Sequence, residues 1–179
     1  MNIYKGQLCN VIPLRVCLEN FKPTKSQRKI LKKGSFFSHK IQPVNITQKQ
    51  IDLFEEHKVR FDEGAPNSIH DFLSKEPAKV PGKAYELLVF DNEKLVATSY
   101  FDLGREAISS IYGMFAPDYG NYSLVIYTML IEIEYAIKNQ FIYYYHGYCY
   151  DVSSFYDYKK RFVASEFYDW QEAWHEYKP

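Results

Sequence analysis

The feature that most restricts the fold is the segment from Ser123 to Gln140, SLVIYTMLIEIEYAIKNQ, which is long and strongly apolar. As a helix it would make about five turns. A helix of this apolar character has to be buried. The residues on either side, 107–115 and 141–145, are rich in β-branched and aromatic side chains, which favour strands. The segment therefore predicts a helix that packs across a sheet.

Residue patterns predict the remaining elements. Strands are expected at 10–18, 35–44, 85–91, 94–102 and 107–115, with a hairpin turn at Asp91-Asn92-Glu93 and with Pro13 at an edge or a bulge. Helices are expected at 24–33, 47–61 and 68–75, capped by Thr24 or Ser26, by Asn45 or Thr47, and by Asn67 or Ser68, with Gly34 ending the first. The acidic tail, 169–177, has the spacing of a further helix.

The order of these elements is a meander of strands, a central helix, a strand, and then a helix with room for a last strand. This order resembles the acyltransferase fold typified by the GCN5-related N-acetyltransferases. We therefore expect residues 1–179 to form a single α+β domain (α/β, three layers), with a mixed, mainly antiparallel sheet flanked by helices. In those enzymes a glycine-rich loop before the central helix binds coenzyme A. The corresponding loop here, 117–123, contains only Gly120, so no cofactor is expected.

Composition limits the class of protein. The three cysteines form no CxxC pair, so neither a disulfide framework nor a metal site is expected, and a cytoplasmic location fits. No apolar run is long enough for a signal peptide or a membrane span, so no membrane partner is expected.

The net charge of zero hides a division along the chain. Residues 1–50 contain ten Lys and Arg against one Glu, a net charge of +9, so the other residues carry −9. A segregated positive region indicates a polyanionic partner, most often a nucleic acid. The alternative is an ordinary solvated, lysine-rich surface.

The stretch from Phe141 to Phe162 has the character of a functional site. A Tyr-rich strand breaks at Gly147, a loop with Ser153 and Ser154 follows, and a short helical or turning segment returns Lys159, Lys160 and Arg161. Glycine permits a close approach that a side chain would block. The alternative interpretation is a core strand followed by a solvated basic turn.

Several separated motifs together resemble the C-terminal domain of the arginyl- and leucyl-tRNA–protein transferases. They are Pro13-Leu14-Arg15-Val16 with Ser26-Gln27-Arg28-Lys29, Ser110-Ile111-Tyr112, Pro117-Asp118, Ser123-Leu124, and Tyr145-His146-Gly147-Tyr148 with Tyr158-Lys159-Lys160-Arg161-Phe162. The likeness begins close to the first residue, so the cysteine-containing N-terminal region of the family is expected to be lacking.

The resemblance implies an aminoacyltransferase. Its donor would be aminoacyl-tRNA, and its acceptor would be the N-terminal α-amine of a protein, which is thereby marked for degradation. An aminoacyl ester is already activated, so the acceptor amine needs deprotonation, alignment and a place for the developing oxyanion, without a covalent nucleophile. The donated amino acid, arginine or leucine, is left open.

The resemblance also implies roles for particular residues. Catalytic candidates are Tyr145, Tyr148 and Asp118. Asp118, Asp102 and Glu132 are candidates for holding an amine or a cationic side chain of the donor. The residues expected to bind tRNA, by phosphate contact or by stacking, are Arg15, Ser26, Gln27, Arg28, Lys29, Tyr158, Lys159 and Arg161. The expected substrate cleft comprises Tyr112, Ser123, Gly147 and Tyr148. Arg15 is equally suited to a structural role at a strand end, and the tyrosines to the core.

Two other functions stay open. One is an N-acetyltransferase that uses acetyl-coenzyme A. The other is a catalytically silent RNA-binding or adaptor module that kept the basic face.

Overall fold

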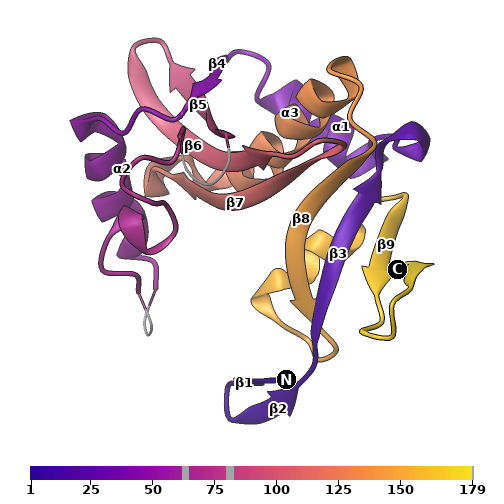
Figure 1. The fold of residues 1–179 in the computed structure, drawn as a ribbon. Helices are drawn as coiled ribbons and strands as arrows, with labels where there is room; N and C mark the ends of the chain where they lie inside the picture. The colour runs from indigo at the N-terminus through magenta and orange to yellow at the C-terminus, as the bar shows by residue number, and fades with distance from the viewer. Residues whose placement is uncertain (62–64, 80–82, 179) are drawn as a thin grey trace.

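A computed structural model describes residues 1–61, 65–79 and 83–178. Its largest element is an eight-stranded sheet with the order β10-β9-β3-β8-β7-β6-β5-β4 (Figure 1). Its strands are β3 (Val11–Cys17), β4 (Ser38–Pro43), β5 (Lys83–Asp91), β6 (Lys94–Leu103), β7 (Ala107–Phe115), β8 (Tyr143–Tyr150), β9 (Ser165–Tyr168) and β10 (Trp174–Glu176). Neighbouring strands are antiparallel except β7 and β8, which run parallel. A separate hairpin joins β1 (Asn2–Tyr4) and β2 (Gln7–Cys9).

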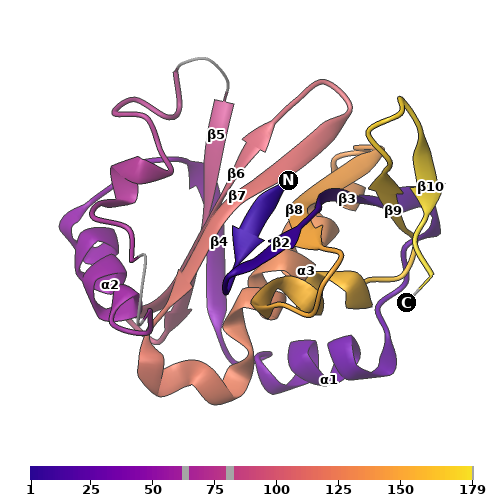
Figure 2. The ribbon, with the colours of Figure 1, turned by 90° about the horizontal axis from the view of Figure 1, so that it is seen from below.

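Helices pack against both faces of the sheet (Figures 1 and 2). Helices α1 (Lys25–Lys33) and α3 (Leu124–Lys138) share one face, where they enclose the larger hydrophobic core. Helix α2 (Gln48–Lys58) and the short 3₁₀ helix η2 (Ile69–Asp71) cover a second core on the opposite face. The mixed α+β class, with a mainly antiparallel sheet flanked by helices, is confirmed.

Helix α3 is the predicted central helix. Leu124, Leu130 and Ile133 are almost completely buried against the sheet. Burying one such side chain contributes about 1.5–3 kcal/mol, so the apolar character of the segment accounts for its position.

Helix ends were predictable from local chemistry. Thr24 caps α1 and Thr47 caps α2, each through a capping box with the glutamine three residues later, and Gly34 follows the last residue of α1. In both boxes the side chains satisfy backbone N–H groups that have no partner inside the helix.

Two predicted helices are wrong. Residues 68–75 form only the single turn of η2, because one turn is enough to bury both Ile69 and Leu73. The tail is a strand, β10, which pairs with β9. Trp174 packs its ring on Tyr145 and Tyr168, and this tertiary contact outweighs the helical spacing of the tail.

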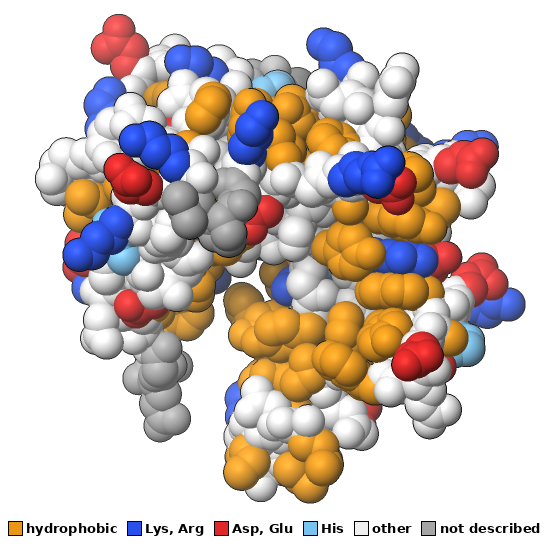
Figure 3. All heavy atoms as spheres, viewed as in Figure 1, with side chains coloured by type: hydrophobic (Ala, Val, Ile, Leu, Met, Phe, Trp, Pro, Cys, Tyr) orange, Lys and Arg blue, Asp and Glu red, His pale blue; other side chains and the backbone are white. Residues whose placement is uncertain are grey.

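Strands β7 and β8 separate after a very short ladder. They pair only through Ala107–Ser109 of β7 and Tyr143–Tyr145 of β8. Beyond these residues the two strands diverge (Figure 1), and the surface is hollowed between the part that carries α2 and the part that carries β8 and β3 (Figure 3). We call this place the strand split. The predicted break at Gly147 is wrong, because β8 continues through Gly147 to Tyr150.

Candidate functional site

A β-bulge in β8 lies just beyond the last residue that pairs with β7. Leu14 of β3 pairs with Gly147 and Arg15 pairs with Tyr145, which leaves His146 as the additional residue. Gly147 has a φ of +92°, a conformation that other residues rarely adopt. Bulges bend the strand that carries them. The bulge thus accounts for why the glycine does not end the strand.

Lys159 reaches this bulge from the 3₁₀ helix η4 (Phe155–Arg161), which packs against β8. Its Nζ lies 2.8 Å from the position that a Cβ would take on Gly147. The ammonium also lies over the rings of Tyr148 and Tyr156, 5.4 Å and 5.1 Å from their centroids. Burial lowers the pKa of Lys159 to about 8, and the nearby Cys149 thiol opposes this shift.

No described residue forms an ion pair or a hydrogen bond with the Lys159 ammonium. The lysine is half-buried, and the two rings that contact it offer only their faces. Such contacts stabilise a cation without neutralising it. The ammonium is therefore free to pair with an oxygen of a ligand.

His146 is the second polar group of the bulge. It is 2% exposed, and neither ring nitrogen makes a hydrogen bond of normal geometry. Its ring stacks on Tyr144 with a centroid distance of 6.0 Å and lies 5.5 Å from the ring of Phe162. Burial, and then the charge of Lys159, lower the pKa of His146 to about 3, so the imidazole is neutral.

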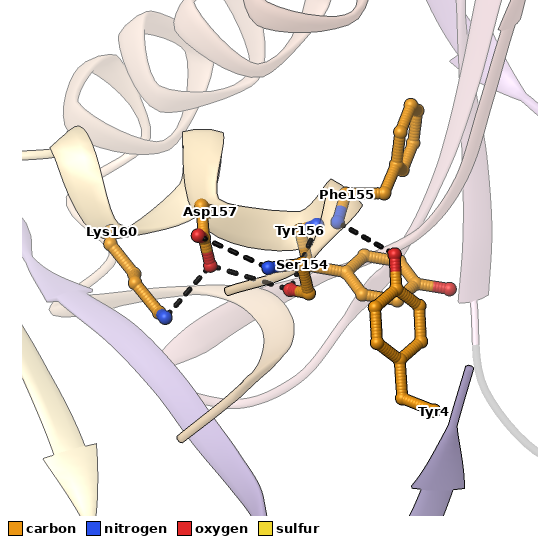
Figure 4. A network of polar contacts seen from close by, with 6 residues as sticks. All are labelled: Tyr4, Ser154, Phe155, Tyr156, Asp157 and Lys160. Carbon is orange, nitrogen blue, oxygen red and sulfur yellow. Dashed lines mark hydrogen bonds and ion pairs between the residues drawn. The ribbon is translucent and has the colours of Figure 1, made fainter. Parts of the chain in front are cut away.

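A polar network fixes the start of η4 (Figure 4). The Oγ of Ser154 accepts from the N–H of Tyr156 at 3.2 Å, and Asp157 accepts from the N–H of Ser154 at 3.2 Å. Lys160 pairs with Asp157 at 2.7 Å, and the hydroxyl of Tyr4 accepts from the N–H of Phe155 at 3.1 Å. Short helices need such caps, so this network determines where Lys159 stands.

Glu132 forms a buried network at the point where β7 and β8 begin to separate. It is fully buried on α3, and it accepts hydrogen bonds from Ser99 of β6 and, at 2.7 Å, from the hydroxyl of Tyr144 on β8. Burial raises the pKa of Glu132 to about 7, and the hydrogen bonds limit the shift. The sequence suggested that Glu132 holds an amine. Both of its oxygens are instead occupied by hydroxyl groups.

The structure places the two tyrosines of η4 in different surroundings. Tyr158, predicted to stack on tRNA, packs against the main core, and burial raises its pKa to about 12. Tyr156 instead places its ring beside Lys159 and Tyr148. The sequence offered one signal for this, because Tyr156 precedes Lys159 by three residues, about one turn. His146 was also overlooked, although it stands directly before Gly147 in the motif.

Arg15 occupies an aromatic box on the other face of β8. Its Nε donates to Glu166 at 2.6 Å and its Nη1 donates to the Tyr145 hydroxyl at 3.3 Å. Its guanidinium lies 3.8 Å from the ring centroid of Tyr143 and 4.1 Å from that of Trp174. These contacts join β3, β8, β9 and β10, so they give Arg15 and Tyr145 a structural role.

The basic candidates of α1 and η4 lie on the face that carries α3. Ser26, Arg28 and Lys29 are exposed on α1, and Arg161 is exposed at the end of η4. Phe21, which precedes α1, stacks on Phe162, which follows η4, with ring centroids 6.4 Å apart. We call these exposed residues of α1 and η4 the basic face. Gln27 is not part of it, because its side chain is buried in the capping box of α1.

The remaining candidates are Asp118, Ser123, Tyr112 and Asp102. Asp118 is exposed in the 3₁₀ helix η3 (Pro117–Tyr122), and Ser123, the N-cap residue of α3, has a φ of +55°. Tyr112 of β7 stacks on Phe72 with a centroid distance of 4.0 Å, and Asp102 is exposed near the end of β6. Within the described residues, no hydrogen bond or ion pair joins any of these four to the bulge.

Residues 49–169 match the family described as "Arginine-tRNA-protein transferase, C terminus". The chain belongs to this family. The matched range contains β7, α3, β8 and η4, and hence every residue of the bulge site. It does not include the motif at Pro13–Val16 or α1.

Curated relatives of the family carry the name aspartate/glutamate leucyltransferase. The chain is 24% identical over 166 residues to the protein of Xanthomonas campestris pv. campestris, with 88% of this chain and 66% of that protein covered. It is 28% identical over 162 residues to the protein of Marinobacter nauticus, with 88% and 68% covered. The chain thus spans about two thirds of the length of these family members.

Solved structures resemble this chain in fold alone. L-PGS from Bacillus licheniformis superposes with a TM-score of 0.59 and 14% identity, covering 83% of this chain and 49% of that chain. FemX superposes with a TM-score of 0.56 and 8% identity, covering 80% and 54%. No helix within residues 1–61, 65–79 and 83–178 has the length and apolar character needed to span a bilayer.

Proposed function

We propose that this protein transfers an amino acid from aminoacyl-tRNA to the N-terminal α-amine of an acceptor protein. The observation that carries the proposal is that the family match covers the whole bulge site, where an ammonium with no described ion pair or hydrogen bond lies against Gly147. Transfer from an ester to an amine requires positioning and charge stabilisation rather than a covalent intermediate. A cation with no described partner suits that requirement.

The donated amino acid is proposed to be leucine. The curated relatives are named leucyltransferases, whereas the family description names arginine. The charge at the bulge supports leucine, because Lys159 is a cation and would repel the guanidinium of a bound arginyl group. The acceptors are proposed to begin with Asp or Glu, as the relatives' names suggest. The modified protein would then be marked for degradation in the cytoplasm.

The basic face is proposed to hold the tRNA. Arg28, Lys29 and Arg161 are exposed on the face that carries α3, and the bulge site is reached through η4, which ends at Arg161. Phosphate contacts by Lys and Arg supply affinity without sequence readout. The proposal includes an acetyltransferase-like fold, in which a ligand enters where two neighbouring strands separate. The short ladder between β7 and β8 supports it.

A transfer assay tests the proposal. Radiolabelled leucyl-, arginyl- and alanyl-tRNA would each be offered with peptides that begin with Asp, Glu or Ala, and acetyl-coenzyme A would be offered separately. We expect label from leucyl-tRNA on the Asp and Glu peptides only. Consumption of acetyl-coenzyme A without any aminoacyl transfer would show an acetyltransferase instead. Binding of tRNA without transfer from any donor would show an RNA-binding module.

A further inference from the structure

The environment of Lys159 suits a cation that binds a negatively charged group. The ammonium is brought to the bulge of β8 by η4, where it lies against Gly147, which has no side chain, and beside the rings of Tyr148 and Tyr156. An ordinary surface lysine extends into water, and a buried structural lysine is paired with a carboxylate. Lys159 does neither within the described residues.

We propose that Lys159 is the catalytic cation of the transfer step, which contacts the reacting ester at the carbonyl oxygen and at the ribose oxygen that leaves. This inference rests on the proposed function. Both oxygens are bonded to the same carbon, so one ammonium with three N–H donors can reach both. The half-buried setting strengthens the interaction, because the local dielectric constant is lower than that of water.

The transfer passes through a tetrahedral intermediate. The neutral α-amine of the acceptor attacks the ester carbonyl carbon, a C–N bond forms, and the electron pair of the C=O bond moves onto oxygen, where the Lys159 ammonium stabilises it. The intermediate collapses, and the C–O bond to the terminal ribose breaks. Lys159 gives a proton to the ribose oxygen and takes one from the former amine. The products are an amide and a tRNA with a free hydroxyl group.

The charges around Lys159 favour this role. From β8, His146 is neutral, Tyr148 offers its ring face, and burial raises the pKa of the Cys149 thiol, which therefore stays protonated at neutral pH. From η4, Tyr156 offers its ring face, and Asp157 is paired with Lys160. None of these groups removes the charge of the ammonium, so it stays available to the substrate.

A pH dependence follows from the ammonium. With a pKa of about 8, Lys159 is protonated below that pH and loses its charge above it. The acceptor α-amine, with a usual pKa of about 7.7–8.0, must be neutral to attack, so its reactivity rises over the same range. We expect the single-turnover rate to follow a bell-shaped profile with its maximum near pH 8, and the alkaline limb to belong to Lys159.

The test compares Lys159→Met, Lys159→Arg and Lys159→Ala with the control Lys138→Met, an exposed lysine in the last turn of α3. Single-turnover transfer from saturating leucyl-tRNA to an Asp peptide is measured between pH 6 and 10, together with tRNA affinity and circular dichroism. We expect Lys159→Met to lower the rate about 10²–10³-fold, the usual cost of one oxyanion donor. Affinity for tRNA should stay within about threefold, and the alkaline limb should disappear.

Two further results separate chemistry from structure. Lys159→Arg keeps the charge and should shift the alkaline limb beyond pH 10, since guanidinium does not titrate there. Ethylamine added to Lys159→Ala should restore part of the rate, which a merely structural lysine would not allow.

Several outcomes would overturn the inference. A saturating rate unchanged in Lys159→Met, with tRNA affinity reduced, would make Lys159 a phosphate contact while the transferase function stands. The inference would also be rejected if a folded Lys159→Met protein kept the alkaline limb, or if ethylamine restored no activity to Lys159→Ala. A wild-type protein that transfers no amino acid from any donor would reject the proposed function, and the inference with it.

Discussion

The missing side chain of Gly147 is what allows Lys159 to lie against β8, because a Cβ at that position would stand 2.8 Å from Nζ. Real Cβ atoms essentially never come so close to another heavy atom. The left-handed backbone of Gly147, with a φ of +92°, and its role in the bulge point to the same residue type. Gly147 thus allows both the bend of β8 at the bulge and the position of the Lys159 ammonium against the strand.

Replacing Gly147 by Ala should therefore impair transfer and stability together. The left-handed conformation costs a residue with a Cβ about 1–2 kcal/mol, which should lower the melting temperature by a few degrees. The displaced ammonium should lower the transfer rate at least tenfold. Gly120→Ala is the matched control, because a Cβ there meets nothing within 4 Å. Full activity in Gly147→Ala would show that the position of the ammonium does not matter.

The two tyrosines of η4 should behave differently. Tyr156→Ala removes a ring from beside Lys159, so we expect slower transfer with little change in melting temperature. Tyr158→Ala removes a ring that packs against the core, so we expect a loss of about 3 kcal/mol in the free energy of unfolding. Urea unfolding measures the stability of both variants, and transfer assays measure their activity. The opposite pattern would restore Tyr158 as the ring that contacts the ligand.

Salt dependence should identify the surface that binds tRNA. Arg28→Ala combined with Lys29→Ala should weaken binding and lower the slope of log affinity against log salt by about 1.4–1.8, since each phosphate contact contributes about 0.7–0.9. The control pair is Lys75→Ala with Lys79→Ala, exposed lysines near η2 on the opposite face. If the control pair lowers the slope and the Arg28 and Lys29 pair does not, the tRNA interface lies on the face that carries η2.

Stability should depend on pH through Glu132. Its pKa is raised in the folded protein to about 7 from an ordinary value of 4.5, so folding favours the protonated form. The contribution is complete below pH 4.5 and is lost as pH rises through about 7. Over that range the wild-type free energy of unfolding should fall by about 3 kcal/mol relative to Glu132→Gln, which does not titrate. If urea unfolding gives the same difference in free energy of unfolding between wild type and Glu132→Gln at every pH, this assignment is wrong.

The sequence predicted most of what local chemistry controls. The apolar helix 124–138, the caps at Thr24 and Thr47, and the hairpin around Asn92 depend on nearby residues, and each was placed correctly. The motif also singled out Gly147, and the structure has a β-bulge with a positive φ at that residue.

What the sequence could not show depends on contacts between distant segments. Trp174 draws the tail into a strand through rings on β8 and β9. Gly147 continues a strand because β3 pairs with both sides of the bulge. Tyr158 turns inward and Tyr156 toward Lys159 because η4 packs on β8, which the spacing of aromatic residues does not reveal.

The position of β3 has a consequence for how the chain folds during synthesis. Arg15 bonds to Tyr145 and to Glu166, which follow it by 130 and 151 residues. The first strand of the large sheet therefore cannot complete its pairing, and Leu14 and Val16 stay unburied, until the residues up to Glu166 have left the ribosome. Pairings between segments so far apart are slow to form, and exposed strands meanwhile invite aggregation. Deleting residues 165–176, which form β9 and β10, should thus lower the yield of folded protein in cells.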